Sequence, residues 1–328
     1  MPADGEWNLE YGAEGLHPAV DFTFGTIRSG FPLMEPYEIT YADGDLGDAP
    51  MPRTDSVRLG QDYRGPATLT FEMGVDTVPP AGTVVAFSRH ANNLDALSVM
   101  AQAWDAEGLR RRFATPAVLR TMQAGRARRF YGRPRKWAAT GSRLTRQGYT
   151  PVVATFTCVD ATAYDDVEQS ARIVLQPAPH RGLQGPLTDP ITMGGAGVGT
   201  VQAGLHIEGT KAAWPVITIR GPITRPSVQL LDQVVPGPGG TERSLPGWTV
   251  GLNLDLKDTD SVTIDTRPWA RTVLRNGVAS VAGALTWGSP RLENLRLPVG
   301  IQNMLLYGTS DTGTATMTVA WRNAYAYL

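Results

Sequence analysis

Apolar and polar residues alternate along several short stretches of the chain, which is typical of β-strands with one buried face. The alternation occurs in residues 21–25, 37–41 and 68–73. Residues 117–122 and 128–137 show it on either side of Ala124-Gly125, so these two stretches are predicted to pair as neighbouring strands. Residues 152–159 carry β-branched and apolar side chains on both faces, which predicts a fully buried strand.

One stretch follows the period of an α-helix instead. The apolar positions that share one helical face are Leu94, Leu97, Met100, Ala101 and Trp104. Asn92 and Asn93 are candidate N-caps, and Gly108 suits the position that follows a last helical turn. The sequence therefore predicts a helix over residues 92–107.

Short strands separated by turns recur after residue 201. They are predicted at residues 214–220, 227–231, 248–256, 261–265, 271–275, 278–282, 304–308 and 314–321. Asn276-Gly277 lies between two of them and favours a hairpin with a type I′ turn. The 36 glycines and 25 prolines are about one and a half times the usual share, which indicates a turn-rich protein. Roughly eight strands at this spacing predict a β-sandwich.

A glycine-rich stretch at residues 176–204 separates the two halves of the chain. Its run GGAGVG at residues 194–199 does not have the spacing G-x-G-x-x-G, and strand-like sequence follows it where a dinucleotide site would need a helix. We therefore predict a loop without a bound cofactor. The predicted domains are residues 1–175 and residues 176–328.

Composition and charge exclude several classes of protein. A hydrophobic content of 42% with a formal net charge of −1 argues against disorder. Residues 1–25 contain no basic region leading into an apolar one, so no secretory signal is expected. No apolar run approaches the roughly 18–20 residues that cross a bilayer, and no membrane partner is expected.

Few residues carry chemistry. Cys158 is the only cysteine, which excludes an internal disulfide, and its apolar strand predicts an inert core thiol. The histidines have no metal-binding spacing and are His17, His90, His180 and His206. Asp43-Gly44-Asp45 lacks the glycine and the closing glutamate of a calcium loop and is predicted to form a turn. We therefore predict no catalytic residue, no metal site and no cofactor.

The charge is distributed unevenly along the chain. Residues 110–146 hold twelve cations and no acid, which leaves 18 of the 30 cations for the rest of the chain against 31 acids. The cations are Arg110, Arg111, Arg112, Arg120, Arg126, Arg128, Arg129, Arg133, Arg135, Lys136, Arg143 and Arg146. This basic segment binds nucleic acid, pairs with an acidic surface on a neighbouring copy, or forms a solvated face without a partner.

The second interpretation is favoured. A net charge near zero gives little long-range attraction for nucleic acid, so no specific nucleic-acid partner is expected. Cations on both faces of one strand suit a strand wedged between neighbouring molecules in a symmetric assembly. The residues predicted to lie in that subunit interface are Arg126, Arg128, Arg129, Arg133, Arg135 and Lys136.

Several blocks of sequence resemble the distal tail proteins of siphophages, in the style of the minor tail proteins of actinobacteriophages. In the second half these blocks are residues 214–228 (WPVITIRGPITRPSV), 262–266 (VTIDT), 271–277 (RTVLRNG), 297–303 (LPVGIQN) and 317–325 (MTVAWRNAY). The first half adds residues 128–135 (RRFYGRPR) and 159–164 (VDATAY). The resemblance covers most of residues 90–328.

The resemblance implies a mainly β protein with an N-terminal, β-barrel-like belt domain that contains one helix, and a C-terminal galectin-like β-sandwich. It implies that six copies form a ring through the belt domains. That homohexamer would join the tail tube protein to the tail-tip hub, contact other minor tail or receptor-binding proteins, and let DNA pass. Its place would be the virion, at the distal end of a long non-contractile tail.

The alternative function is a carbohydrate-binding module for host adhesion. Trp248, Trp269 and Trp287 lie in the predicted sandwich, where exposed indoles could stack on a sugar ring. The competing interpretation is that these tryptophans fill the core of the sandwich or its seams. Exposed indoles on one loop face would favour the first interpretation.

Overall fold

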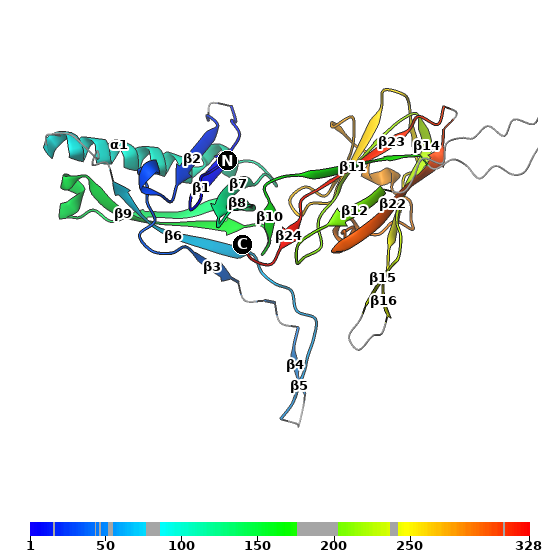
Figure 1. Ribbon diagram of the computed structural model, residues 1–328, viewed down its shortest axis with the longest axis horizontal. Coiled ribbons are helices and arrows are strands. Elements are labelled where there is room, and N and C mark those ends of the chain that lie inside the picture. The colour runs from blue at the N-terminus through cyan, green and yellow to red at the C-terminus, as the bar shows by residue number, and fades with distance from the viewer. Residues whose placement is uncertain are drawn as a thin grey trace, which may run out of the picture. The chain divides into compact units, whose positions relative to one another are not determined.

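The computed structural model describes the chain except for residues 16, 43, 46, 52–54, 77–85, 176–202, 237–241 and 311 (Figure 1). The chain forms two compact units. The first is Met1–Val167 together with Tyr325–Leu328, and the second is Glu168–Ala324. The predicted boundary at residue 175 lies eight residues after this division, and the glycine-rich run at residues 194–199 lies outside the described residues.

The first unit is built on one antiparallel sheet with the strand order β2-β1-β7-β8-β9-β6-β3. These strands are β1 (Trp7–Tyr11), β2 (Val20–Phe24), β3 (Glu38–Tyr41), β6 (Ala67–Asp76), β7 (Ala117–Gln123), β8 (Arg126–Ala139) and β9 (Tyr149–Cys158). The short strand β10 (Ala163–Asp165) pairs with β8 beside them. The prediction of a mainly β protein is confirmed, although the described strands form an open sheet and no closed barrel.

The sequence predicted the hairpin of the basic segment correctly. Strands β7 and β8 pair antiparallel in an unbroken register from Ala117 opposite Gly132 to Gln123 opposite Arg126. Ala124 and Gly125 form the turn with φ values of 49° and 74°. Because both turn residues have positive φ, the turn matches the right-handed twist of the two strands.

Helix α1 (Ala86–Asp105) begins six residues earlier than predicted, and Asn93 is not its N-cap. Asn93 lies inside the helix and is fully buried. Its amide nitrogen donates to the carbonyl oxygens of Val75 (3.1 Å) and Gly148 (2.9 Å), and its oxygen accepts from the Thr150 hydroxyl (2.6 Å). These three bonds join the helix to two segments of the first unit and override the capping preference of asparagine.

We expect Asn93→Ala to lower the free energy of unfolding of the first unit by about 2–3 kcal/mol, because it leaves buried polar groups without partners. Asn92→Ala removes the adjacent, exposed amide and is expected to change it by less than about 0.5 kcal/mol. Denaturant unfolding of both variants measures the difference. Equal stability of the two variants would contradict the role of Asn93.

The end of helix α1 also differs from the prediction. Ala106, with a φ of 46°, takes the left-handed conformation that terminates the helix. Gly108 lies instead within the one-turn helix α2 (Glu107–Arg110), where it is buried. A Cβ atom at Gly108 would approach the side chain of His17 to 2.9 Å, so close packing accounts for this glycine.

An aromatic cluster forms the core of the first unit. Phe24 and Phe71 pack edge to face with ring centroids 5.1 Å apart, and Trp104 of α1 packs on Phe24 at 5.6 Å. The Trp104 indole nitrogen donates to the carbonyl oxygen of Thr155 (3.0 Å), so the helix is bonded to the sheet as well as packed on it. Met100 is also buried as predicted, whereas Leu94 is exposed because the buried stripe of the helix starts at Asn93.

Strand β9 is not buried on both faces as the sequence predicted. Its side chains alternate between buried and half-buried from Tyr149 to Cys158. The β-branched residues Val153, Thr155 and Thr157 stand on the half-buried face. Such residues favour any pleated strand, so their presence does not distinguish a covered face from a partly open one. Cys158 is buried, which confirms the prediction of a core thiol.

The second unit is a sandwich of two antiparallel sheets with the orders β11-β23-β13-β19-β20-β21 and β12-β22-β14-β17. The first contains β11 (Gln169–Val174), β13 (Val216–Arg220), β19 (Ser261–Asp265), β20 (Thr272–Arg275), β21 (Ala279–Ser280) and β23 (Thr316–Trp321). The second contains β12 (Ala203–Ile207), β14 (Ile223–Leu230), β17 (Trp248–Gly251) and β22 (Gly300–Thr309), with β18 (Asp255–Leu256) beside β14. Both sheets contribute to one hydrophobic core, which confirms the predicted sandwich.

The Asn276-Gly277 turn is confirmed. Both residues have positive φ (51° and 72°), as a type I′ turn requires. The Val278 amide closes the turn on the carbonyl oxygen of Arg275 at 3.1 Å.

The remaining elements are short. Two-stranded ribbons are formed by β4 (Ala49–Pro50) with β5 (Val57–Arg58), and by β15 (Gln233–Pro236) with β16 (Glu242–Leu245). Strand β24 (Ala324–Tyr325) ends the chain's regular structure, and 3₁₀ turns occur at Ile27–Ser29, Arg143–Gln147, Ala282–Ala284 and Leu292–Asn294. None of the described helices combines the length and the hydropathy needed to cross a membrane.

Candidate functional site

Half of the twelve cations of the basic segment form ion pairs within the same chain. The pairs are Arg110–Asp105, Arg111–Glu107, Arg112–Glu14, Arg120–Glu10, Arg128–Asp165 and Arg129–Asp166. Two of the acids, Glu10 and Glu14, belong to the acidic N-terminal third of the chain. The sequence predicted that the basic segment pairs with acids of a neighbouring copy, whereas these six arginines pair with acids of their own chain. Pairing between copies stays a prediction.

Arg129 is the most deeply buried of the predicted interface residues. Its Nε and Nη2 atoms donate to Asp166 Oδ1 at 2.9 and 2.6 Å, and Nη2 also donates to the Asp166 carbonyl oxygen at 2.9 Å. The two side chains are only 10% and 5% exposed. Burial alone would lower the pKa of Arg129, but Tyr131 and Asp166 offset this effect and raise the pKa.

Arg128 and Arg133 also have partners within the first unit. Arg128 pairs with Asp165, and its guanidinium carbon lies 3.8 Å from the centre of the Tyr325 ring. Arg133 donates through Nε and Nη2 to the carbonyl oxygen of Thr115 at 3.1 and 3.0 Å. These two arginines therefore hold the C-terminal residues and the segment after α2 against the sheet.

The other three predicted interface residues remain available to a partner. Arg126, Arg135 and Lys136 are exposed, and none forms an ion pair with a described residue. The register between β8 and β9 shifts between Pro134 and Trp137, so Arg135 and Lys136 lie in a β-bulge. A bulge bends its strand and redirects side chains, which accounts for two adjacent cations that both reach solvent. Their place in an interface between copies stays a prediction.

A cavity of about 380 Å³ lies next to this bulge. It is lined by Trp104, Asp105, Arg110, Arg135 and Trp137, at the end of helix α1. The buried indole nitrogen of Trp137 has no hydrogen-bond partner among the described residues. Two cations, one carboxylate and two indole rings thus line the same cavity, and Arg110 is paired there with Asp105.

The three tryptophans considered as sugar platforms under the alternative function have different environments. Trp248 is half-buried against the sandwich core, and its indole nitrogen donates to the Arg296 carbonyl oxygen at 2.9 Å. Trp269 lies near the Arg267 guanidinium, 5.5 Å from its carbon to the ring centre. Trp287 is fully exposed, with a relative accessibility of 104%. Trp287 lines a pocket of the second unit.

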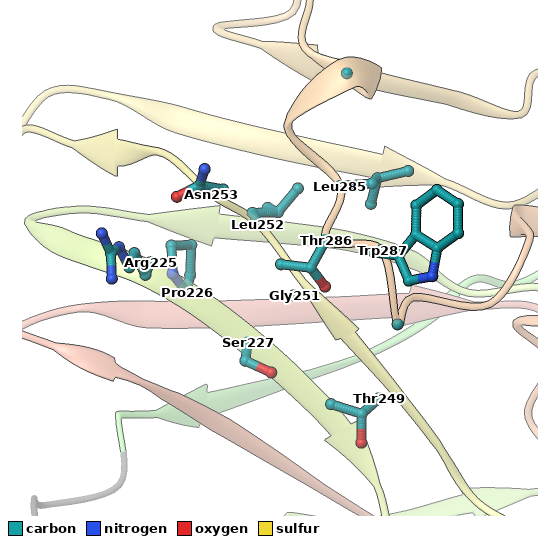
Figure 2. Close-up of a pocket in the computed structure, with 12 residues that line it drawn as sticks. Arg225, Pro226, Ser227, Thr249, Gly251, Leu252, Asn253, Leu285, Thr286 and Trp287 are labelled. Atoms are coloured by element: carbon teal, nitrogen blue, oxygen red, sulfur yellow. The ribbon is translucent and has the colours of Figure 1, made fainter.

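That pocket lies on the second sheet of the sandwich and has a volume of about 650 Å³. Figure 2 shows Arg225 and Asn253 toward one end, Trp287 toward the other, and Ser227 and Thr249 on the strands between them. The polar residues come from β14, from β17 and from the residue pair that follows β17. Sequence reasoning missed these four residues, because no spacing along the chain reveals that separate strands bring them together.

The described residues contain no arrangement suited to metal binding, since no group of three histidine, cysteine or carboxylate side chains converges. Asp43 of the predicted turn lies outside the described residues, and Asp45 and the nearby Asp48 bond to the segment at residues 60–63. The backbone of Asp45 pairs with that of Tyr63, and Asp48 Oδ1 accepts from the Gly60 amide at 3.0 Å.

Burial and the nearby Asp160 raise the pKa of the Cys158 thiol, which keeps it protonated and unreactive at neutral pH.

No family model matches the chain, and no curated protein matches it. Solved structures do match, over both units. One is the crystal structure of the SPP1 Dit protein, which is described as a paradigm of the hub adsorption apparatus in phages that infect Gram-positive bacteria. It matches with a TM-score of 0.50 and 13% sequence identity, and the match covers 97% of this chain and 98% of that chain. A chain of the phage P2 baseplate in its activated conformation with Ca has a TM-score of 0.51 and 9% identity, covering 98% and 99%. At these identities the likeness shows a shared fold.

Proposed function

We propose that this chain, which has the fold of the phage distal tail (Dit) proteins, is a structural protein of a phage tail tip. The observation that carries the proposal is the fold likeness to the SPP1 hub protein over 97% of this chain, which includes both units. The blocks at residues 214–228 and 317–325 support it from the sequence. Fold alone does not fix function, and here the sequence blocks and the fold point to the same family.

We propose further that six copies form a ring that joins the tail tube to the tail-tip hub and lets DNA pass. Unpaired edges of a sheet are commonly paired or covered, and β2 and β3 end the described sheet of the first unit. Head-to-tail contacts between copies would cover such edges and close by rotation. No catalytic step is part of this proposal.

The contact between copies is assigned to the exposed cations of β8, which are Arg126, Arg135 and Lys136. Arg128, Arg129 and Arg133 support it indirectly, because their bonds fix the strand that carries the other three. Cations at the rim of an interface mainly set register and association rate. The ring is therefore expected to loosen as the salt concentration rises.

The place of the protein in the virion can be tested directly. In electron micrographs, antibodies raised against the chain are expected to label particles of the phage that encodes it at the end of the tail away from the head. Gold label on the capsid or along the whole tail would contradict a tail-tip role. A particle preparation from which the chain is absent would contradict a structural role.

Reversing two charges tests the assigned contact. Arg135→Glu/Lys136→Glu is expected to raise the concentration needed for half-assembly by roughly tenfold or more, because like charges would then face each other across the interface. Arg143→Glu/Arg146→Glu makes the same change in net charge at two exposed arginines of the same segment, outside β8. This control is expected to assemble like the unchanged chain. Equal assembly of the two variants in sedimentation velocity would exclude Arg135 and Lys136 from the contact.

A further inference from the structure

The pocket of the sandwich presents polar side chains that have no side-chain partner among the described residues. Arg225, Ser227, Thr249 and Asn253 make no side-chain hydrogen bond or ion pair with any other described residue. By contrast, Thr286 at the same pocket bonds through its hydroxyl to Ser289 at 2.9 Å. Arg225, Ser227 and Thr249 lie on strands, so the backbone positions of three of these side chains are fixed before a ligand binds.

The backbone at Arg225 is held in an uncommon conformation. Its φ is 49°, a left-handed value that costs energy for a residue with a side chain. The register of β14 against β22 shifts here, between Thr224 and Ser227. The Arg225 amide donates to the Leu254 carbonyl oxygen at 3.0 Å, which fixes the bulge. Bulges and strained residues gather at binding sites because they redirect a side chain, and here the side chain is an unpaired arginine at the pocket.

The indole of Trp287 is exposed on a segment that is itself well fixed. The Thr286 amide donates to the Gly251 carbonyl oxygen at 2.9 Å, and the Asn253 amide donates to the Ala284 carbonyl oxygen at 2.7 Å. These bonds tie the residues on either side of the pocket to one another. The Trp287 indole is therefore an exposed apolar face on a segment whose backbone is bonded, at the end of the pocket opposite Arg225 and Asn253.

We propose that this pocket binds an acidic saccharide. The C–H face of a pyranose ring would stack on the Trp287 indole, and the ring hydroxyls would bond to Ser227, Thr249 and Asn253. A carboxylate or phosphate substituent would pair with the Arg225 guanidinium, which binds either group in a bidentate manner. The pocket volume of about 650 Å³ lies within the range of about 300–1,000 Å³ for small-ligand sites.

The composition of the pocket favours a saccharide over a nucleic acid. A nucleic acid is bound mainly through its phosphates, which requires several cations along a groove. Of the residues that line the pocket, only Arg225 is charged, whereas hydroxyl and amide side chains are numerous. This binding would add a host-surface contact to the structural role and does not depend on the ring.

Titration calorimetry with defined probes tests the proposal. The probes are hyaluronan hexasaccharide for a carboxylate, glucose 6-phosphate for a phosphate, cellohexaose as a neutral saccharide, and adenosine monophosphate as a nucleotide. At least one acidic saccharide is expected to bind, at least tenfold more tightly than cellohexaose. Failure of both acidic saccharides to bind at millimolar concentration would overturn the proposal, and so would tighter binding of adenosine monophosphate.

Variants then locate the site. Trp287→Ala and Arg225→Ala are each expected to weaken binding of the acidic saccharide by about tenfold or more. Arg291→Ala, which removes another highly exposed arginine of the same unit, is expected to bind like the unchanged chain. Unchanged affinity in Trp287→Ala, or an equal loss in Arg291→Ala, would overturn the assigned site. Since Trp287 is fully exposed, its removal should leave the unfolding temperature unchanged, and light scattering shows whether assembly is unaffected.

Discussion

Asp166→Ala is expected to lower the free energy of unfolding of the first unit by about 3–5 kcal/mol. The change leaves the Arg129 guanidinium buried without the carboxylate that accepts two of its hydrogen bonds. It also removes the carboxylate that lies 3.5 Å from Arg120 Nε. Asp166 stands one residue before the first unit ends at Val167, so the loss would also release the segment that leads into the sandwich.

A matched pair of variants separates this buried pair from ordinary surface charges. Glu107→Ala breaks the exposed ion pair with Arg111 and is expected to cost less than about 1 kcal/mol. The double change Arg129→Met/Asp166→Leu replaces the buried pair with apolar side chains of similar size and is expected to recover much of the lost stability. Calorimetric unfolding measures all three. If Asp166→Ala lowers the free energy of unfolding by no more than Glu107→Ala does, the Arg129–Asp166 pair does not stabilise this end of the sheet.

Trp104→Ala is expected to have an effect of similar size, about 3–5 kcal/mol, for a different reason. It removes a buried indole that packs on Phe24 and Phe71 and leaves a cavity between helix α1 and the sheet. It also deprives the Thr155 carbonyl oxygen of its donor. For a unit of this size the unfolding temperature should fall by roughly 10 °C or more.

Two controls accompany this variant. Trp104→Phe keeps an aromatic ring in the core but removes the N–H donor, so it should cost clearly less than Trp104→Ala. Trp287→Ala removes an indole that is fully exposed in the other unit and should change stability by less than about 0.5 kcal/mol. Comparable destabilisation by Trp104→Ala and Trp287→Ala would contradict the described core.

The sequence predicted features that depend on neighbouring residues, such as tight turns, and missed features that depend on residues far apart along the chain. Both turns formed as predicted. At Asn276-Gly277 both residues adopt positive φ readily, whereas at Ala124-Gly125 only the glycine does. The start of helix α1 did not follow from its sequence. Asn93 reads as a cap in isolation, whereas its true partners, Val75, Gly148 and Thr150, lie far away along the chain.

The candidate sites show the same limit. Counting charges located the basic segment, but it could not reveal that Arg128 and Arg129 pair with acids 37 residues further on. The pairing of β10 with β8 places Arg128 and Arg129 beside these acids, whereas a β-bulge exposes Arg135 and Lys136 to solvent. Trp287 was named because an exposed indole can stack on a sugar ring. Arg225 could not be found in this way, because a β-bulge that places an arginine at a pocket has no pattern along the chain.

The most direct test of the ring is the mass of the purified chain in solution, measured by light scattering over a range of protein and salt concentrations. The proposed function predicts a species with six times the mass of one chain at low salt, which dissociates as salt rises. A mass of one chain at every concentration and at every salt level would contradict a ring built from contacts between copies.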